Sequence, residues 1–141
     1  MCIRDRNWAT PANWGGSLPG AGDTALISAG FAVQHASGND TIASLTLSAA
    51  NAVDVSDGSL SITGNMLLGG SFTVSGRGTA TVGGTVSGGG SVVVSGGSLT
   101  LNGAASLAGL NLSGGLLDGT GSLAVVAPIV GGYGAVTVRC V

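Results

Sequence analysis

Carboxylates are the first candidates for chemistry in this chain, because they can act as acids, as bases or as ligands of a cation. Asp54 and Asp57 lie close enough in the sequence to form a weak cation site. Asp54 is at an outward position of an alternating stretch, whereas Asp57 and Asp118 occupy "SDGS" and "LDGT", where aspartate commonly accepts a backbone hydrogen bond in a turn. A solvated polar surface explains these residues more simply than a metal site, and we expect no bound metal.

A second candidate is the stretch "SGNDTIA" at residues 37–43, which contains half of a calcium-binding nonapeptide repeat. Calcium requires about six to eight oxygen ligands, which adjacent turns of such repeats supply together. One copy provides too few of them. We therefore interpret the stretch as an ordinary turn, and we place Asp23 and Asp40 in loops.

The other ionisable side chains lack the partners that catalysis needs. His35 follows the stretch "FAVQ" and has no second histidine or cysteine nearby with which to share a metal, so we expect it in a surface loop. Arg77 lies between two glycines in "SGRGT" and is expected to project from a turn. We therefore expect no catalytic residue, no cofactor and no enzymatic activity in this chain.

Trp8 and Trp14 are the only tryptophans of the chain, and Pro11 and Pro19 lie near them. A repeat protein must cover the open end of its first repeat, which would otherwise expose an apolar column and a strand edge. Large aromatic side chains do this efficiently. We expect residues 7–34 to form an N-terminal cap with the first strands; the alternative is that both tryptophans contact a glycan.

The candidate side chains named above must be positioned by the fold of the chain, and a short sequence unit recurs from Ser44 onward. Its order is small polar, apolar, small or polar, apolar, and glycine or asparagine follows. Strict alternation over four residues is typical of a strand with one buried face, and the intervening glycines supply the positive φ angles of tight turns. The units are SLTL (44–47), AVDV (52–55), SLSI (59–62), SFTV (71–74), TATV (79–82), SVVV (91–94), SLTL (98–101), GLNL (109–112), SLAV (122–125) and AVTV (135–138).

Successive units usually start about six to eight residues apart, which is too short for hairpins of ordinary strands. The spacing suits a coil of three short strands, in which equivalent strands lie about twenty residues apart and stack in parallel. We therefore expect residues 35–138 to form an all-β fold, a parallel β-solenoid of the right-handed β-helix type with about six coils in all. Another all-β form, such as a sandwich, and a disordered linker are the alternatives, and the regularly spaced Leu, Val and Ile argue against the linker.

The alternation also predicts which side chains point inward and which point outward. One coil apart on one side, the outward positions read Asp54, Thr73, Val93 and Asn111, so this column is mixed. A flat surface for binding ice or a glycan would require like residues, and we do not expect one. The predicted inward residues are Leu45, Leu47, Leu60, Ile62, Phe72, Val74, Val92, Val94, Leu99, Leu101, Leu110 and Leu112.

The two ends of the chain differ in composition from the rest. Both cysteines, Cys2 and Cys140, and three of the four basic residues lie in residues 1–6 and 139–141. A transposase-based sequencing adapter, AGATGTGTATAAGAGACAG, encodes Met-Cys-Ile-Arg-Asp from its third base, and Arg-Cys-Val followed by a stop codon from its first base. We therefore interpret both ends as translated adapter rather than native protein, and we expect the natural protein to continue in both directions.

Without these ends the chain is acidic. Arg77 stands against five aspartates, which leaves a net charge of −4. Nucleic-acid binding depends on Lys and Arg contacts to phosphates, so we expect no nucleic-acid partner. The most apolar run, "LAVVAPIV" at residues 123–130, is much shorter than the roughly twenty residues of a membrane helix, and we expect no membrane span in this segment.

The stretch "NW…NWGGSLPGAGDTALI" resembles the opening of bacterial surface β-helix proteins, which include autotransporter-type passengers and related sorting-signal-bearing secreted proteins. The later stretch "SGGSLTLNGAASLAGLNLSGGLLDGTGSLAV" is similar to the glycine-rich repeat arrays of the same proteins, so the resemblance covers nearly all of residues 7–138. It implies an extracellular or cell-surface location and flanking repeats of one longer chain as partners. It also implies a non-catalytic stalk or display segment that supports adhesion to surface glycans or to a host or biofilm matrix. The alternative is a glycan-binding module that uses Trp8 and Trp14.

Overall fold

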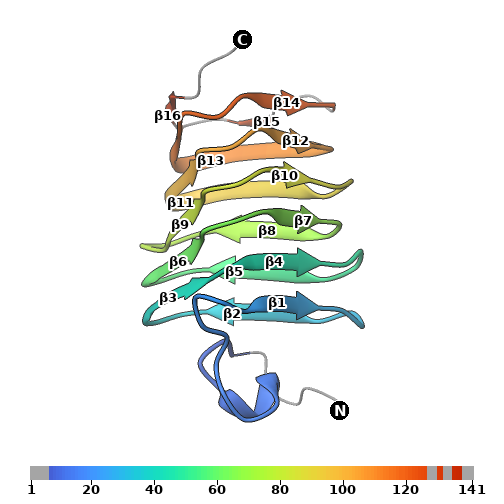
Figure 1. Ribbon diagram of the computed structural model, residues 1–141. Coiled ribbons are helices and arrows are strands. Elements are labelled where there is room, and N and C mark those ends of the chain that lie inside the picture. The colour runs from blue at the N-terminus through green and yellow to red at the C-terminus, as the bar shows by residue number, and fades with distance from the viewer. Residues whose placement is uncertain (1–6, 127–129, 132–134, 138–141) are drawn as a thin grey trace.

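Short alternating stretches between glycine-rich turns form a stack of strands in the computed structural model, which describes residues 7–126, 130–131 and 135–137. The described strand pairs run parallel, and the chain winds through one strand on each of three sides before it begins the next coil (Figure 1). The predicted parallel β-solenoid is therefore confirmed. The ends interpreted as adapter, residues 1–6 and 139–141, lie outside the described residues.

Five coils follow one another, and strands β14 to β16 continue the stack at the end opposite the N-terminal cap (Figure 1). A short 3-10 helix, η1 (Pro11–Trp14), lies in the cap, and the described residues contain no helix long and apolar enough to cross a membrane. The strands are β1 (Thr24–Ile27), β2 (Ala32–His35), β3 (Asn39–Ile42), β4 (Ser44–Leu47), β5 (Ala52–Val55), β6 (Ser59–Ile62), β7 (Met66–Leu68), β8 (Ser71–Val74), β9 (Thr79–Val82), β10 (Val86–Ser87), β11 (Ser91–Leu101), β12 (Ala105–Leu107), β13 (Gly109–Asp118), β14 (Leu123–Val125), β15 (Val130–Gly131) and β16 (Ala135–Thr137).

The strands form three faces, and the strands within each face run parallel to one another. We number the faces in the order in which the chain passes through them. Face 1 contains β1, β4, β7, β10, β12 and β14. Face 2 contains β2, β5, β8, the first parts of β11 and β13, and β15; face 3 contains β3, β6, β9, the last parts of β11 and β13, and β16. The sequence distance between register partners ranges from 18 residues, for Ala105 and Leu123, to 21 residues, for Leu45 and Met66. This agrees with the predicted coil of about twenty residues.

In the fourth and fifth coils, one continuous strand covers both face 2 and face 3. The sequence predicts two separate strands, 91–94 and 98–101, with a turn between them, but β11 is continuous over both. The pairing of β11 with β13 shifts register on either side of Ser95, so the strand bends there. Gly97 follows with a φ of +65°, a conformation that glycine adopts without the steric cost of a Cβ atom.

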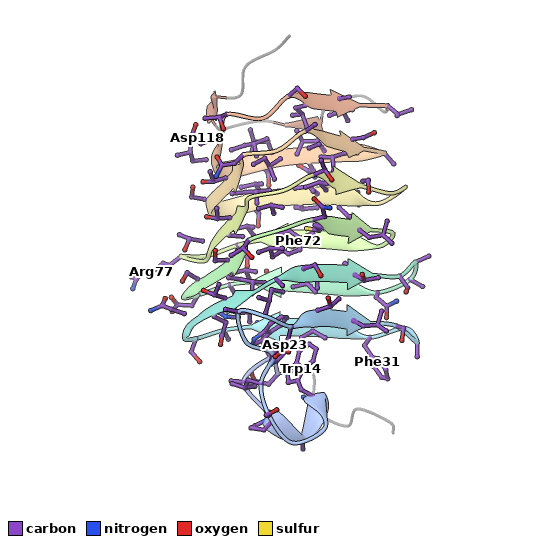
Figure 2. All side chains as sticks on the ribbon, in the orientation of Figure 1. Trp14, Asp23, Phe31, Phe72, Arg77 and Asp118 are labelled. Atoms are coloured by element: carbon purple, nitrogen blue, oxygen red, sulfur yellow. The ribbon has the colours of Figure 1, made fainter. Side chains whose placement is uncertain are left out.

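The core is a set of apolar columns that run the length of the stack. All twelve predicted inward residues are buried, each with an exposed fraction of 4 % or less, so the predicted register is confirmed. Phe72 is one of them and lies between the faces (Figure 2). Each such side chain packs against its equivalents in the coils above and below, so the core is continuous and no coil buries its apolar face alone.

Three strands of face 1 are too short for the alternation to predict them. β7, β10 and β12 have only two or three residues each, and they lie between glycine- or asparagine-containing segments. A stretch of this length shows one or two apolar residues and no period. Met66, Val86 and Ala105 are nevertheless buried in one column, because the coils on either side fix their position.

Close backbone packing at the corner between faces 2 and 3 explains its glycines. Gly58 has a φ of +70°, and a Cβ atom there would overlap the carbonyl oxygen of Gly38 in the coil below. Gly97 has the same kind of conformation, and its Cβ would overlap the carbonyl of Gly78. At this corner successive coils approach more closely than a side chain allows.

The corner between faces 1 and 2 of the second coil depends on one buried amide, that of Asn51. Its side-chain Nδ2 donates hydrogen bonds of 2.9 Å to the carbonyls of Ser48 and Ala49, and its Oδ1 accepts one of 2.8 Å from the backbone N–H of Phe31. The amide thus closes its own turn, in which Ala50 has a φ of +63°, and joins it to the first coil. The sequence pattern does not predict this role of Asn51, because a single asparagine beside alanines has no periodicity.

Candidate functional site

The N-terminal cap extends face 2 beyond the first coil. Asn7 forms an isolated parallel bridge with Gln34 of β2, and the backbone N–H of Trp8 donates a 2.8 Å hydrogen bond to the Gln34 carbonyl. The side chain of Asn13 donates a 2.9 Å hydrogen bond back to the Asn7 carbonyl, which fixes η1 above the end of the stack. The cap therefore occupies part of the strand edge that the first coil would otherwise expose.

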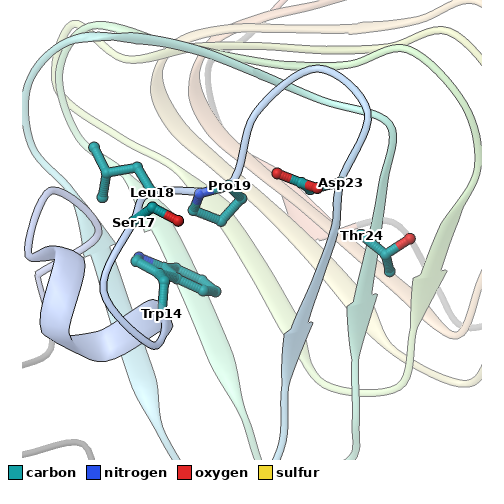
Figure 3. A pocket seen from close by; sticks show the side chains of 6 residues that line it. All are labelled: Trp14, Ser17, Leu18, Pro19, Asp23 and Thr24. Carbon is teal, nitrogen blue, oxygen red and sulfur yellow. The ribbon is translucent and has the colours of Figure 1, made fainter.

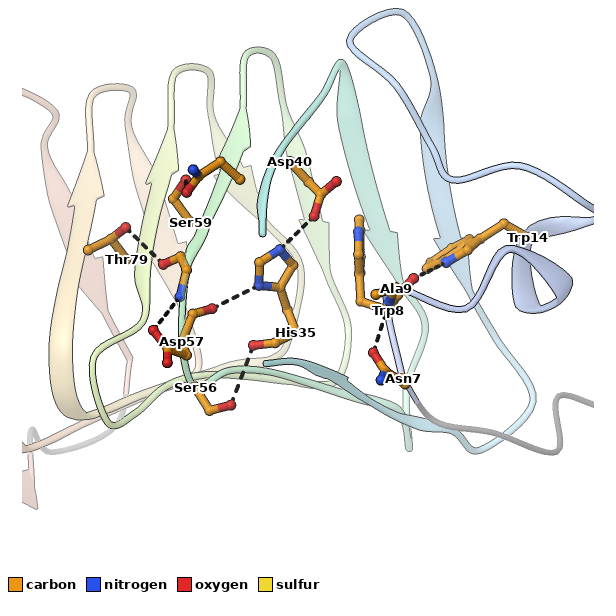
Figure 4. Close-up of polar contacts among 12 residues, drawn as sticks. Asn7, Trp8, Ala9, Trp14, His35, Asp40, Ser56, Asp57, Ser59 and Thr79 are labelled. Atoms are coloured by element: carbon orange, nitrogen blue, oxygen red, sulfur yellow. Dashed lines mark hydrogen bonds and ion pairs between the residues drawn. The ribbon is translucent and has the colours of Figure 1, made fainter. Parts of the chain in front are cut away.

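Trp8 and Trp14 pack against each other in this cap and have different exposures. Their ring centroids lie 4.7 Å apart with an interplanar angle of 59°, and Nε1–H of Trp14 donates a 2.7 Å hydrogen bond to the Trp8 carbonyl (Figure 4). Trp8 is fully buried on the core, with an exposed fraction of 0 %. It therefore presents no indole surface to a glycan. Of the two tryptophans that the alternative interpretation assigns to glycan contact, only the half-buried Trp14 can touch a ligand in this structure.

His35 and Asp40 form a polar pair inside the first coil, which corrects the expectation that both lie in loops. His35 is the last residue of β2 and is 0 % exposed, while Asp40 lies on β3. Nε2 of His35 is 2.8 Å from Oδ2 of Asp40, and Nδ1 is 3.1 Å from the carbonyl of Asp57 (Figure 4). The indole ring of Trp8 packs against the imidazole ring of His35, with the ring centroids 5.8 Å apart.

The sequence contained a signal for this pair. The strand continues one residue beyond "FAVQ", and its period of two places Val33 and His35 on the same inward side. Asp40, at an inward position of the next strand, supplies the partner that a buried histidine requires. The half-repeat "SGNDTIA", expected to be a turn, instead contains strand β3, and its Asp40 carboxylate is directed to His35.

Both ring nitrogens of His35 have a partner. The Asp57 carbonyl can only accept, so Nδ1 donates to it, and Nε2 lies within hydrogen-bonding distance of the Asp40 carboxyl group. A buried polar side chain requires such partners, and the pair supplies them inside the core.

A pocket of about 290 Å³ opens in the cap beside Trp14. The indole forms one side of it, with Pro19 close above, and the carboxylate of Asp23 lies across from the ring (Figure 3). Asp23 stays in a loop, as predicted, and closes a turn in which its Oδ2 accepts a 2.8 Å hydrogen bond from the backbone N–H of Gly20. The pocket is lined by Trp14, Ser17, Leu18, Pro19, Asp23 and Thr24.

No protein-family model, no curated protein and no solved structure matches this chain. The β-solenoid fold is therefore established by the strand register and the buried columns of the chain itself. Function has to be argued from its side chains.

The other charged residues that the sequence offered as candidates lie apart from the pocket beside Trp14. Asp54 points outward on face 2, and its Oδ1 accepts a 2.8 Å hydrogen bond from the Ser75 hydroxyl. Asp57 and Asp118 each accept a 2.7 Å hydrogen bond from the next backbone N–H, as expected, although Asp118 is the last residue of β13 rather than part of a turn. Arg77 is exposed and projects from the edge of the stack (Figure 2).

These acids do not gather into a metal centre within the part of the chain that the structure describes. There, no three His, Cys, Asp or Glu side chains lie together in a way that could hold a metal ion. Asp54 and Asp57, considered above as a weak cation site, instead have separate protein partners. Each of these carboxylates is therefore accounted for by a local hydrogen bond.

The outward columns differ between the faces. On face 2 the register places Gln34, Asp54, Thr73, Val93 and Asn111 in one column, so the mixed column predicted from the sequence is confirmed. Face 3 is more uniform over the first four coils, where its two outward columns are Asn39, Ser59, Thr79 and Ser98, and Thr41, Ser61, Thr81 and Thr100. In the fifth coil these columns continue with Leu116 and Asp118.

Proposed function

We propose that this chain is a non-catalytic structural segment, a stalk or display element of a large secreted bacterial surface protein that supports adhesion. The observation that carries the proposal is the continuity of the three strand ladders from the first coil to the fifth. Every described coil is hydrogen-bonded to its neighbours on three sides, so the chain is a rod whose length is set by the number of coils. A rod of this kind holds whatever is attached to its ends at a fixed separation.

The surface chemistry is consistent with an extracellular spacer. In the first four coils the outward positions of face 3 are hydroxyl-bearing or amide side chains without charge, and the residues between the two ends contain no cysteine that an oxidising environment would cross-link. In this proposal the partners are flanking repeats of the same longer chain, which would continue the ladders, together with surface glycans or a host or biofilm matrix. The secreted, surface-exposed location is supported by the sequence resemblance described above.

A distance measurement tests the spacer function. Leu26 and Ala124 are both exposed on face 1, and five coil steps separate them, which corresponds to about 24 Å at the usual strand spacing. Spin labels would be attached after Leu26→Cys and Ala124→Cys, with Cys2→Ser and Cys140→Ser to remove other thiols. We expect a narrow distance distribution in double electron–electron resonance.

Removing one coil provides the decisive comparison. Met66 and Val86 are register partners, so deletion of residues 66–85 joins Asn65 to Val86 and removes one full turn. The label distance is expected to fall by about 5 Å while the distribution stays narrow. Deletion of residues 66–75 alone breaks the register and should prevent folding. A broad distribution, or a one-coil deletion that leaves the distance unchanged, would rule out a rigid spacer.

The location is tested separately in the cell that encodes the parent protein. An epitope inserted at Gly89, an exposed loop glycine whose surroundings leave room for added atoms, should be stained by antibody on intact cells. Staining that requires permeabilised cells would contradict the surface location without affecting the spacer result.

A further inference from the structure

We propose that the pocket between Trp14 and Asp23 binds the pyranose ring of a neutral sugar. This binding would be a second property of the cap. It does not depend on the spacer function, because five of the six residues that line the pocket precede the first strand and only Thr24 belongs to it.

The Trp14 indole offers a fixed aromatic surface to a ligand in the pocket. One side of the Trp14 indole packs against Trp8, and its Nε1–H is held by the Trp8 carbonyl, so the orientation of the ring is fixed. Another part of the ring lines the pocket (Figure 3). The C–H groups of a pyranose form an apolar patch that packs on such a ring, and a fixed ring loses little entropy when a ligand binds.

Asp23 supplies hydrogen-bonding capacity opposite the ring. Oδ2 of Asp23 is used by the Gly20 N–H, while Oδ1 has no hydrogen-bond partner among the described residues. A carboxylate oxygen that faces a pocket can accept a charge-assisted hydrogen bond from a sugar hydroxyl. The exposed side chain of Ser17 offers a second donor and acceptor at the rim. An aromatic ring with a carboxylate across from it and a hydroxyl at the rim matches the two kinds of surface on a sugar.

The position of Asp23 is fixed by the second coil. Its backbone carbonyl accepts a 2.9 Å hydrogen bond from the N–H of Ala43, and Thr24, the next residue, begins β1. Pro19 restricts the loop on the other side of the pocket. The ring and the carboxylate are thus held by different parts of the structure before any ligand arrives, which lowers the entropic cost of binding.

Charge and size define the class of sugar. Among the described residues, Asp23 is the only charged side chain that lines the pocket, so its carboxylate would repel a uronic or sialic acid but not a neutral hexose. The volume of about 290 Å³ is at the small end for ligand pockets and suits one ring. A second depression of about 270 Å³ lies on face 2 over Ala32 and Ala52, beside Asp54, but it contains no aromatic side chain.

The test is a titration of the full chain with methyl glucoside, methyl galactoside and glucuronate, followed by the two tryptophan indole N–H signals in an NMR spectrum. The Trp14 signal is the one that Trp14→Phe removes. We expect a saturable shift of this signal with at least one of the neutral glycosides and a weaker or absent shift with glucuronate. No saturable shift with either neutral glycoside, or tighter binding of glucuronate than of both, would overturn the proposal.

Matched variants locate the site. Asp23→Asn keeps the acceptor for Gly20 but removes the charge, and we expect about tenfold weaker binding of the neutral glycoside, since hydrogen bonds to charged groups are stronger. Asp118→Asn makes the same change at a distant turn and should leave binding unchanged. Asp54→Asn probes the depression on face 2, and a larger loss there than for Asp23→Asn would place the sugar on face 2 and refute the cap site. Thermal unfolding of each variant shows whether the cap is intact.

Discussion

Inside the first coil, Nε2 of His35 lies 2.8 Å from Oδ2 of Asp40, at positions that the second coil fills with Val55 and Leu60. The register makes His35 the equivalent of Val55 and Asp40 the equivalent of Leu60. A polar pair has therefore replaced an apolar pair at the point where the core meets the cap. Each member is acceptable there only because the other is present.

This relationship predicts a strong coupling between the two residues. His35→Val alone leaves Asp40 without its partner and is expected to cost about 3 kcal/mol, near the low end for a broken buried pair because the Asp40 side chain keeps 20 % exposure. Asp40→Leu alone should have a similar effect. The double variant copies the second coil and is expected to be at least as stable as the natural chain.

Urea unfolding of the four chains measures this coupling as a double-mutant cycle. Additive losses, with the double variant the least stable of all, would show that the two side chains do not depend on each other.

Neighbouring residues on one strand should respond oppositely to the same charge. Ala80 points into the core with an exposed fraction of 2 %, and Thr81 points out on face 3. Ala80→Asp buries an unpaired carboxylate and is expected to unfold the chain or cost more than about 3 kcal/mol. Thr81→Asp should change stability by less than about 1 kcal/mol. Circular dichroism during urea unfolding compares the two, and equal losses would contradict the register.

The glycine corner predicts a large effect of a single methyl group. Gly58→Ala would place a Cβ atom against the Gly38 carbonyl at a positive φ, and we expect a loss of about 2–4 kcal/mol. Gly89→Ala is the matched control, because nothing lies within 4 Å of the added atom. Its effect should stay within about 0.5 kcal/mol. If thermal unfolding shows the two variants to be alike, close stacking is not the reason for glycine at residue 58.

The buried amide of Asn51 predicts a loss that an exposed asparagine does not share. Asn51→Ala removes the side-chain hydrogen bonds to the Phe31 N–H and to the Ser48 and Ala49 carbonyls, and is expected to cost about 2 kcal/mol. Asn102→Ala, at an exposed position after β11, should be nearly neutral. Hydrogen exchange at the Phe31 amide checks the mechanism, since it should become faster in the first variant and stay unchanged in the second.

The sequence by itself determined the solenoid and its register. Period-two alternation states which face of each strand is apolar, and the recurrence of that pattern about every twenty residues states which strands must stack. This is why all twelve predicted inward residues are buried. It also predicted the mixed outward column of face 2, which follows from the same spacing.

Only the tertiary structure decided what happens at the first coil. Whether His35 lies in a loop or in the core depends on where β2 ends and on Asp40, Asp57 and Trp8 coming together around it. These contacts join residues from the cap, the first coil and the second coil, and they do not repeat. The same holds for Trp8, which is buried, and Trp14, which lines a pocket. The structure of a repeat can be predicted from its period, because every coil packs its apolar residues in the same way. The end of a repeat array packs differently, through contacts that occur only once and therefore leave no periodic pattern in the sequence.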